Sequence, residues 1–124
     1  MVWNRFTPAL FSFATLLCAS ATASATGTGS SGPGVPSFLS YQNSGIVFVY
    51  FLDSIRTGTP PGCAANLGGT YYRLAFDSTT AGGKSMLAGL VAAHEAGEGV
   101  WPYGTGDCTA DSSTETLMDF TTAN

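Results

Sequence analysis

The chain has 124 residues, with four Lys and Arg against eight Asp and Glu and a net charge of −4. This length suits one small domain with a modest core, and the few scattered basic residues exclude the clustered Lys and Arg that a nucleic-acid surface needs. Because only 10% of the residues are charged, hydroxyl and amide side chains must cover much of the surface, which suits neutral, hydroxyl-rich partners and is also ordinary for exported proteins.

Residues 1–25 have the pattern of a secretory signal peptide. A basic residue near the start is followed by an apolar run from Ala9 to Cys18 and by small residues before a cleavage site after Ala25. The run is too short to cross about 30 Å of hydrocarbon, so we expect a secreted or periplasmic protein without a membrane span. A lipid anchor at Cys18 is an alternative that Leu17 disfavours, since lipoprotein signals need a small residue there.

The rest of the chain divides into a leader and a domain. Residues 26–36, TGTGSSGPGVP, have no apolar periodicity and contain four glycines, which predicts a flexible leader. Residues 37–124 are then the binding domain. Within it, short runs of β-branched and aromatic residues bounded by Gly, Pro, Asn or Asp predict five strands at 38–41, 46–52, 70–76, 100–103 and 115–121.

One long segment, residues 77–101, predicts a helix followed by the fourth strand. At 100° per residue a single apolar stripe contains Met86, Leu87, Leu90, Ala93 and His94. Ser78 or Thr79 is the expected N-cap of this helix, and Gly97 is the residue expected to end it in the left-handed conformation.

The predicted order of three strands, one helix and two strands indicates a mainly β fold with one α-helix. It fits a small five-stranded barrel of the OB type whose open end is plugged by the helix. An α+β sheet with one covering helix is the alternative. The two cysteines outside the predicted signal peptide, Cys63 and Cys108, predict one disulfide in an exported protein.

No motif predicts catalysis, a cofactor or a metal site. Gly83-Lys84-Ser85 lacks the glycine five residues earlier that a phosphate loop requires, and His94-Glu95 lacks the second histidine of a zinc protease. One histidine is too few for a catalytic zinc centre. His94 is better explained as a core or rim residue that donates to the backbone than as the base of a Ser-His-Asp triad. We therefore expect a protein that is not an enzyme.

The order of several motifs resembles a known family. A Gly-Thr-Pro turn at residues 58–60 precedes a cysteine, an aromatic-rich strand ends at Asp77, a helix rich in Gly and Ala follows, and a Gly-x-Gly-x-Cys turn ends at Cys108. Over roughly residues 37–121 this order looks like that of the binding subunits of the subtilase-cytotoxin and typhoid-toxin type. The resemblance implies an OB fold that binds cell-surface glycans, a homopentamer and a catalytic partner subunit.

The family's binding residues carry over only in part. Thr59 matches the threonine of the Gly-Thr-Pro turn that contacts glycan in the typhoid-toxin type, and Arg56 lies near a basic residue with a similar role there. The Tyr-Tyr-Ser stretch of that toxin has no counterpart in residues 32–37, GPGVPS. The resemblance therefore does not carry a sialic-acid specificity to this chain.

Side chains suited to a sugar site combine an apolar ring with nearby hydrogen-bonding groups. By this criterion and by the resemblance, the predicted ligand-binding residues are Thr59, Arg56, Tyr41, Ser40 and Gln42. Further candidates are Tyr71, Tyr72, Arg73, Trp101 and Tyr103. Strand alternation makes one of the two adjacent tyrosines a core ring, and the tryptophan is expected to pack against the helix.

These observations favour a secreted glycan-binding module without catalysis of its own. The alternative is a secreted protein-binding domain, of the inhibitor or adhesion type, on the same fold. The apolar, lightly charged strands around Phe48 and Tyr50 are a hint of oligomerisation, although these side chains are equally compatible with an interior position.

Overall fold

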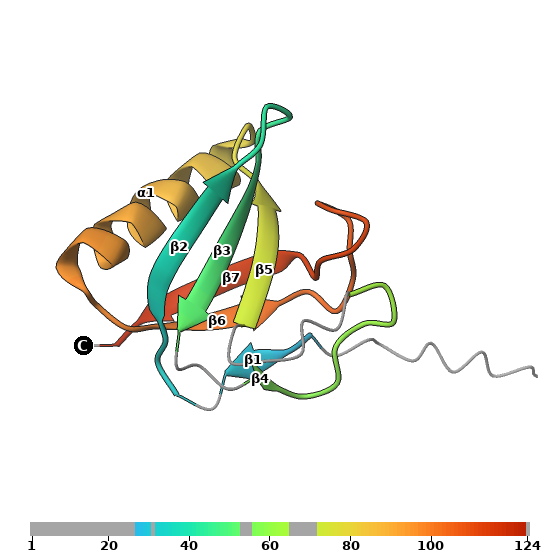
Figure 1. The fold of residues 1–124 in the computed structure, drawn as a ribbon, viewed down its shortest axis with the longest axis horizontal. Coiled ribbons are helices and arrows are strands. Elements are labelled where there is room, and N and C mark those ends of the chain that lie inside the picture. Colours follow the sequence, from blue (N-terminus) through green and yellow to red (C-terminus); the bar gives the residue numbers. More distant parts are fainter. Residues whose placement is uncertain (1–26, 31, 53–55, 65–71, 124) are drawn as a thin grey trace, which may run out of the picture.

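The structure, a computed structural model, describes residues 27–30, 32–52, 56–64 and 72–123 (Figure 1). The predicted signal peptide lies outside the described residues. The chain forms, in order, β1 (Gly29–Ser30), β2 (Val35–Tyr41), β3 (Ile46–Leu52), β4 (Arg56–Thr57), β5 (Tyr72–Asp77), α1 (Ala81–Ala96), β6 (Val100–Gly104) and β7 (Leu117–Thr122). The prediction of a mainly β fold with one helix is confirmed.

The largest sheet is antiparallel, with the strand order β2-β3-β5. Its central strand, β3, is the run richest in β-branched and aromatic residues, which suit a strand that has neighbours on both edges. Side chains alternate between the two faces of the sheet. The inner face buries Val47, Val49, Phe51, Tyr72, Leu74 and Phe76, whereas the outer face carries Phe38, Ser40, Phe48, Tyr50 and Arg73.

The core lies between the inner face of this sheet, α1 and the β6-β7 pair. Figure 1 shows α1 alongside β2, with β6 and β7 behind the sheet. The predicted helix stripe is largely confirmed, because Leu90 and Ala93 are buried and Met86 and Leu87 pack against the core. The stripe prediction is wrong for His94, which is exposed and hydrogen bonds the Pro36 carbonyl through Nδ1.

α1 has a hydroxyl side chain at its N-cap and a glycine at its end, as the sequence predicts, but its N-cap is a later residue than predicted. Thr80, and not Ser78 or Thr79, is the N-cap, and its Oγ1 accepts a hydrogen bond from the Gly83 N–H at 2.9 Å. Gly97 ends the helix as predicted, with φ 63° and its N–H directed to the last carbonyls. An L-residue with a side chain is disfavoured at this φ, which explains why glycine ends the helix.

The remaining strands form two small pairs, β6 with β7 and β1 with β4. Two isolated bridges join the β6-β7 pair to the large sheet: Gly34 with Val100, antiparallel, and Ala75 with Thr116, parallel. The strands that the structure describes do not form one closed, continuously paired barrel. The OB-type barrel therefore stays a prediction.

The structure differs from the predicted flexible leader. Thr28 is only 1% exposed, its carbonyl accepts from the Gly104 N–H at 2.7 Å, and β2 begins at Val35, three residues before the predicted first strand. β1 pairs with β4, which directly precedes the Gly-Thr-Pro turn at 58–60. Glycine-rich composition indicated flexibility, but the hydrogen-bond partners of this segment lie far away in the sequence and no local pattern reveals them.

Candidate functional site

The structure separates the predicted sugar-binding residues into two groups. Ser40, Tyr41 and Gln42 lie where β2 turns into β3, and Tyr41 is 60% exposed. Arg56 and Thr59 follow the other end of β3, beside β1. Tyr41 pairs with Val47 on β3, and Tyr72, whose ring lies against Arg56, pairs with Phe51. Val47 and Phe51 are four residues apart, which is about 13 Å along the strand. The five residues therefore do not form one compact site.

Arg56 has a structural partner in this arrangement. Its guanidinium carbon lies 4.9 Å from the centre of the Tyr72 ring, and its Nη2 lies 3.5 Å from the Arg73 carbonyl oxygen. Tyr72 is the core ring that strand alternation required. Thr59 is exposed and Trp101 is half-buried, while Tyr71 lies outside the described residues.

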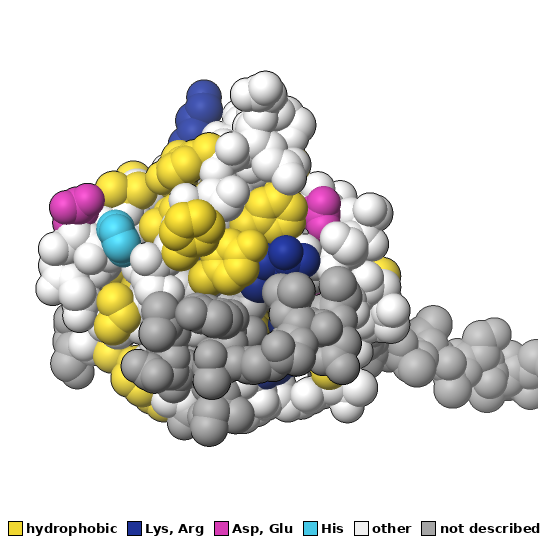
Figure 2. All heavy atoms as spheres, viewed as in Figure 1, with side chains coloured by type: hydrophobic (Ala, Val, Ile, Leu, Met, Phe, Trp, Pro, Cys, Tyr) yellow, Lys and Arg dark blue, Asp and Glu magenta, His cyan; other side chains and the backbone are white. Residues whose placement is uncertain are grey.

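A cluster that no sequence pattern predicts lies on the outer face of the large sheet. We call Phe38, Phe48, Tyr50 and Arg73 the sheet-face patch. The rings of Phe38 and Tyr50 meet edge to face, with centres 5.4 Å apart, and Arg73 places its guanidinium carbon 5.1 Å from the Phe48 ring centre. Phe38 is 59% exposed. Figure 2 shows hydrophobic side chains and basic atoms together over β2, β3 and β5.

Polar groups surround these rings. Arg73 donates from Nη2 to Thr114 Oγ1 at 2.7 Å, and its buried Nε makes no hydrogen bond within the described residues. Ser40, opposite Phe48 in the register, adds a hydroxyl on the same face. Of the predicted ligand-binding residues, Ser40 alone is on the outer face beside these rings. The patch thus combines an exposed aromatic ring with hydrogen-bonding groups, which is the chemistry expected of a sugar site.

The sequence carried a partial signal for the sheet-face patch. Both faces of β3 are apolar. Unless other elements cover both faces, one of them must lie outside the core. In the sequence, Phe48 and Tyr50 are only a hint of oligomerisation. The missing information was the register, which places Phe38 opposite Tyr50 and Tyr50 opposite Arg73.

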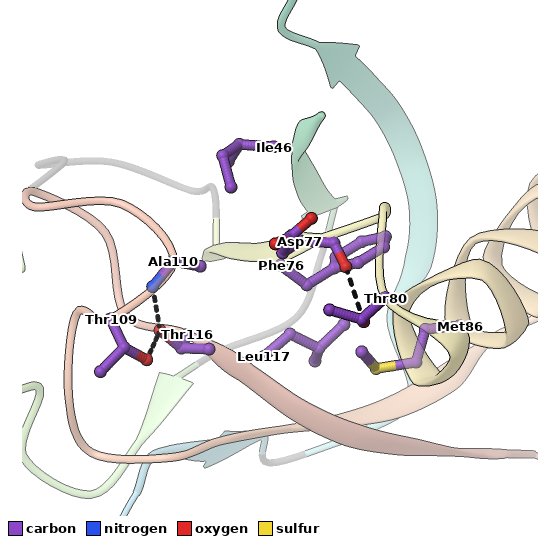
Figure 3. A pocket seen from close by; sticks show the side chains of 9 residues that line it. All are labelled: Ile46, Phe76, Asp77, Thr80, Met86, Thr109, Ala110, Thr116 and Leu117. Carbon is purple, nitrogen blue, oxygen red and sulfur yellow. Dashed lines mark hydrogen bonds between the residues drawn. The ribbon is translucent and has the colours of Figure 1, made fainter. Parts of the chain in front are cut away.

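A pocket of about 420 Å³ lies beyond the Ala75–Thr116 bridge, between the end of β5, the start of α1 and the loop before β7 (Figure 3). We call it the β5-α1 pocket. Its apolar lining consists of Ile46, Phe76, Met86, Ala110 and Leu117. Its polar lining consists of Asp77, Thr80, Thr109 and Thr116. Figure 3 shows the loop residues Thr109, Ala110 and Thr116 across the pocket from Thr80 and Met86.

Two of the long-range contacts that fix the loop over residues 105–116 are a disulfide and a buried carboxylate. The predicted Cys63–Cys108 disulfide is confirmed, with the two Cα atoms 6.2 Å apart. Glu115, fully buried, accepts from the N–H groups of Thr28 and Gly106 at 2.9 and 3.0 Å and from the Thr28 hydroxyl. A buried carboxylate with this many donors anchors its surroundings. Both contacts thus position the loop wall of the β5-α1 pocket.

Tyr72 extends the buried network and gives it a pH dependence. Its hydroxyl lies 2.7 Å from Thr28 Oγ1, and burial raises the pKa of Tyr72 from 10.0 to about 12. Because the folded state favours the neutral phenol, this stabilisation is complete below pH 10 and is lost as the pH rises through 12. The two-unit difference corresponds to about 2–3 kcal/mol.

We therefore expect the free energy of unfolding to fall by about 2–3 kcal/mol between pH 10 and 12 because of Tyr72. Urea denaturation at several pH values across this range measures the fall. Tyr72→Phe removes the ionisable hydroxyl, so its stability should fall less over the same range. Parallel curves for the wild type and Tyr72→Phe would contradict the assignment.

Within the described residues, no group of three or more His, Cys, Asp or Glu side chains is arranged to hold a metal ion. Nor does that part of the chain contain a helix of the length and apolarity needed to cross a membrane.

Comparison with known proteins returns no match to any family model, curated protein or solved structure. The resemblance to toxin binding subunits therefore stays a prediction.

Proposed function

We propose that this chain is a secreted glycan-binding module that holds sugar on the outer face of the β2-β3-β5 sheet and has no catalysis of its own. The observation that carries the proposal is the sheet-face patch. The ring of Phe38 is 59% exposed and can stack on the C–H face of a pyranose. Arg73 and Ser40 lie on the same face and supply hydrogen bonds to its hydroxyls.

Phe38→Ala should weaken glycan binding about tenfold, because a stacked aromatic ring contributes on the order of 1.4 kcal/mol. A glycan array identifies the sugars that the wild type retains, and calorimetry with a retained sugar measures the loss. Met118→Ala is the matched control, since Met118 is 55% exposed on β7 and the variant should bind as the wild type does. No retained signal at any sugar would rule out the proposal.

The proposed fold is an OB-type barrel plugged by α1. Two isolated bridges support this proposal, because they continue the sheet order β2-β3-β5 through β7 and β6 back to β2. In this circuit the β5-β7 contact at Ala75–Thr116 is parallel and the others are antiparallel. A five-stranded, partly open barrel with these neighbours is the OB arrangement.

The proposal extends to export and assembly. Residues 1–25 are proposed to be a signal peptide, and the disulfide is compatible with an oxidising compartment. By the resemblance, the module is proposed to form a homopentamer that carries a catalytic partner subunit. Light scattering on the purified mature chain tests the assembly, and a mass of one subunit at micromolar concentration would contradict it.

A secreted protein-binding domain is the second candidate function. The specific observation in its favour is that the sheet-face patch joins aromatic rings with an arginine, a composition typical of the energetic centres of protein interfaces. Pull-down in the presence of an excess of free sugars separates the two functions. Binding that survives the competition indicates a protein partner, and binding that is lost indicates a glycan.

A further inference from the structure

The β5-α1 pocket has one ionisable residue in its lining, Asp77. Thr79 donates to Asp77 Oδ1 from its N–H at 2.8 Å and from its hydroxyl at 2.6 Å, and these bonds hold the pKa of the carboxyl below its usual value. Within the described residues, the hydrogen bonds to this carboxylate reach Oδ1 and leave Oδ2 available. The pocket is therefore negatively charged at neutral pH and has an open acceptor.

The hydroxyl groups of Thr80 and Thr109 use their protons within the protein, so they can offer a ligand only acceptors. Thr80 donates its hydroxyl proton to the Asp77 carbonyl, and Thr109 donates its proton to the Asp107 carboxylate at 3.0 Å. Their remaining hydrogen-bonding capacity is lone pairs. A ligand that fits this lining must donate hydrogen bonds, as sugar hydroxyl and ammonium groups do. An anionic ligand would face Asp77 without a basic residue in the lining to compensate.

The other walls of the pocket are apolar. Ile46 and Met86 are half-buried and present carbon and sulfur surface, which suits the C–H face of a pyranose. Phe76 and Leu117 are almost fully buried and also belong to the core. The volume of about 420 Å³ falls in the range of about 300–1,000 Å³ that is usual for ligand pockets. Apolar walls with an acceptor-rich rim match a small polyhydroxylated ring better than a flat aromatic or a phosphate.

The pocket is continuous in the fold with the outer face of the large sheet. Ile46, part of its lining, lies on the same face of β3 as Phe48 and Tyr50. Asp77 and Arg73 are four residues apart on β5, about 13 Å along the strand. We propose that the β5-α1 pocket binds the terminal residue of the glycan, a neutral or amino-substituted pyranose, and rejects acidic sugars. This inference rests on the proposed glycan-binding function.

The test titrates the protein with glucose, glucosamine and glucuronic acid, and with the galactose counterparts, at up to about 20 mM, which suits millimolar affinity. Methyl NMR signals of Met86, Leu117 and Ala110 report on the pocket, and the ring signals of Phe38 report on the sheet-face patch. We expect neutral or amino sugars of at least one series to shift the pocket signals and the uronic acids to leave them unchanged.

Asp77→Asn keeps the shape and one acceptor of the side chain but removes its charge. It should weaken binding of the amino sugar at least tenfold and admit the uronic acid. Asp119→Asn, an exposed change on β7, is the matched control and should bind as the wild type does. If Asp77→Asn does not fold, Ala110→Leu fills the pocket from its loop side and should abolish the shifts.

Two results would overturn the inference: pocket signals that no sugar moves, or uronic acids that bind as well as amino sugars. In either case, glycan-dependent shifts at Phe38 would leave the proposed function intact. Sugar-dependent shifts in the pocket without any at Phe38 would instead refute the sheet-face site of the proposed function.

Discussion

Glu115→Ala should lower the free energy of unfolding by about 3–5 kcal/mol, the largest effect that we expect from one side chain here. Glu115 is fully buried, and its carboxylate accepts from Thr28 twice and from Gly106 once. Alanine would leave both N–H groups inside the protein without an acceptor and would open a cavity, while the Thr28 hydroxyl would keep only the Tyr72 hydroxyl as a partner. For a domain of this size, the loss is a large part of the total stability.

Urea denaturation of Glu115→Ala and the wild type at neutral pH measures the difference. Glu95→Ala is the control, because Glu95 is exposed on α1 and its replacement should change stability by less than about 0.5 kcal/mol. The loss in Glu115→Ala should be accompanied by faster amide exchange at Thr28 and Gly106, since both N–H groups lose their acceptor. A stability within about 1 kcal/mol of the wild type would refute the role of this carboxylate.

A related prediction concerns the space beside Glu115. A Cβ on Gly104 would overlap Glu115 Oε1, and the Glu115 side chain is fully buried and has no room to move away. Gly104→Ala should therefore destabilise the protein by an amount comparable to that of Glu115→Ala. The same substitution in the Glu115→Ala background should cost much less, and this non-additivity distinguishes a clash with Glu115 from a backbone effect.

The sequence predicted the elements that carry a periodic pattern. The run of β-branched and aromatic residues in β3, the alternation in β5 and the apolar stripe of α1 each arise within a few neighbouring residues, so they can be predicted locally. Two-residue strands such as β1 and β4 carry no period and were missed. The sequence predicts Glu115 only as the start of a strand, and no residue near it indicates a partner 87 residues away in Thr28.

The candidate site was harder to predict from the sequence because the pairing register of the strands brings its residues together. Tyr41, Thr59 and Arg56 were selected for residue type and position in turns, and the structure distributes them over both ends of β3. Phe38 and Arg73 meet the rings of β3 only because β2 and β5 pair with it in one particular alignment. A shift of one residue would have turned these side chains into the core.

The double substitution Cys63→Ser/Cys108→Ser should cost about 4 kcal/mol of unfolding free energy. The Cys63–Cys108 bond joins residues 45 positions apart, and a loop of that length loses about this much entropy from the unfolded chain when it is closed. Without the disulfide the unfolded chain is more expanded and exposes more surface. The denaturant m-value of the variant should therefore rise while its stability falls. Denaturation of the wild type under reducing conditions should reproduce both changes.

The disulfide and Glu115 hold the same loop, so their effects should depend on each other. Once the 105–116 loop is released from Cys63, fewer of the contacts of Glu115 persist, and Glu115→Ala should cost less in the cysteine-free background than in the wild type. Amino-sugar shifts at Ala110, which lies on this loop, should weaken in the cysteine-free variant while the ring signals of Phe38 keep their response. Fully additive losses and an unchanged Ala110 response would mean that the loop is held in place without either contact.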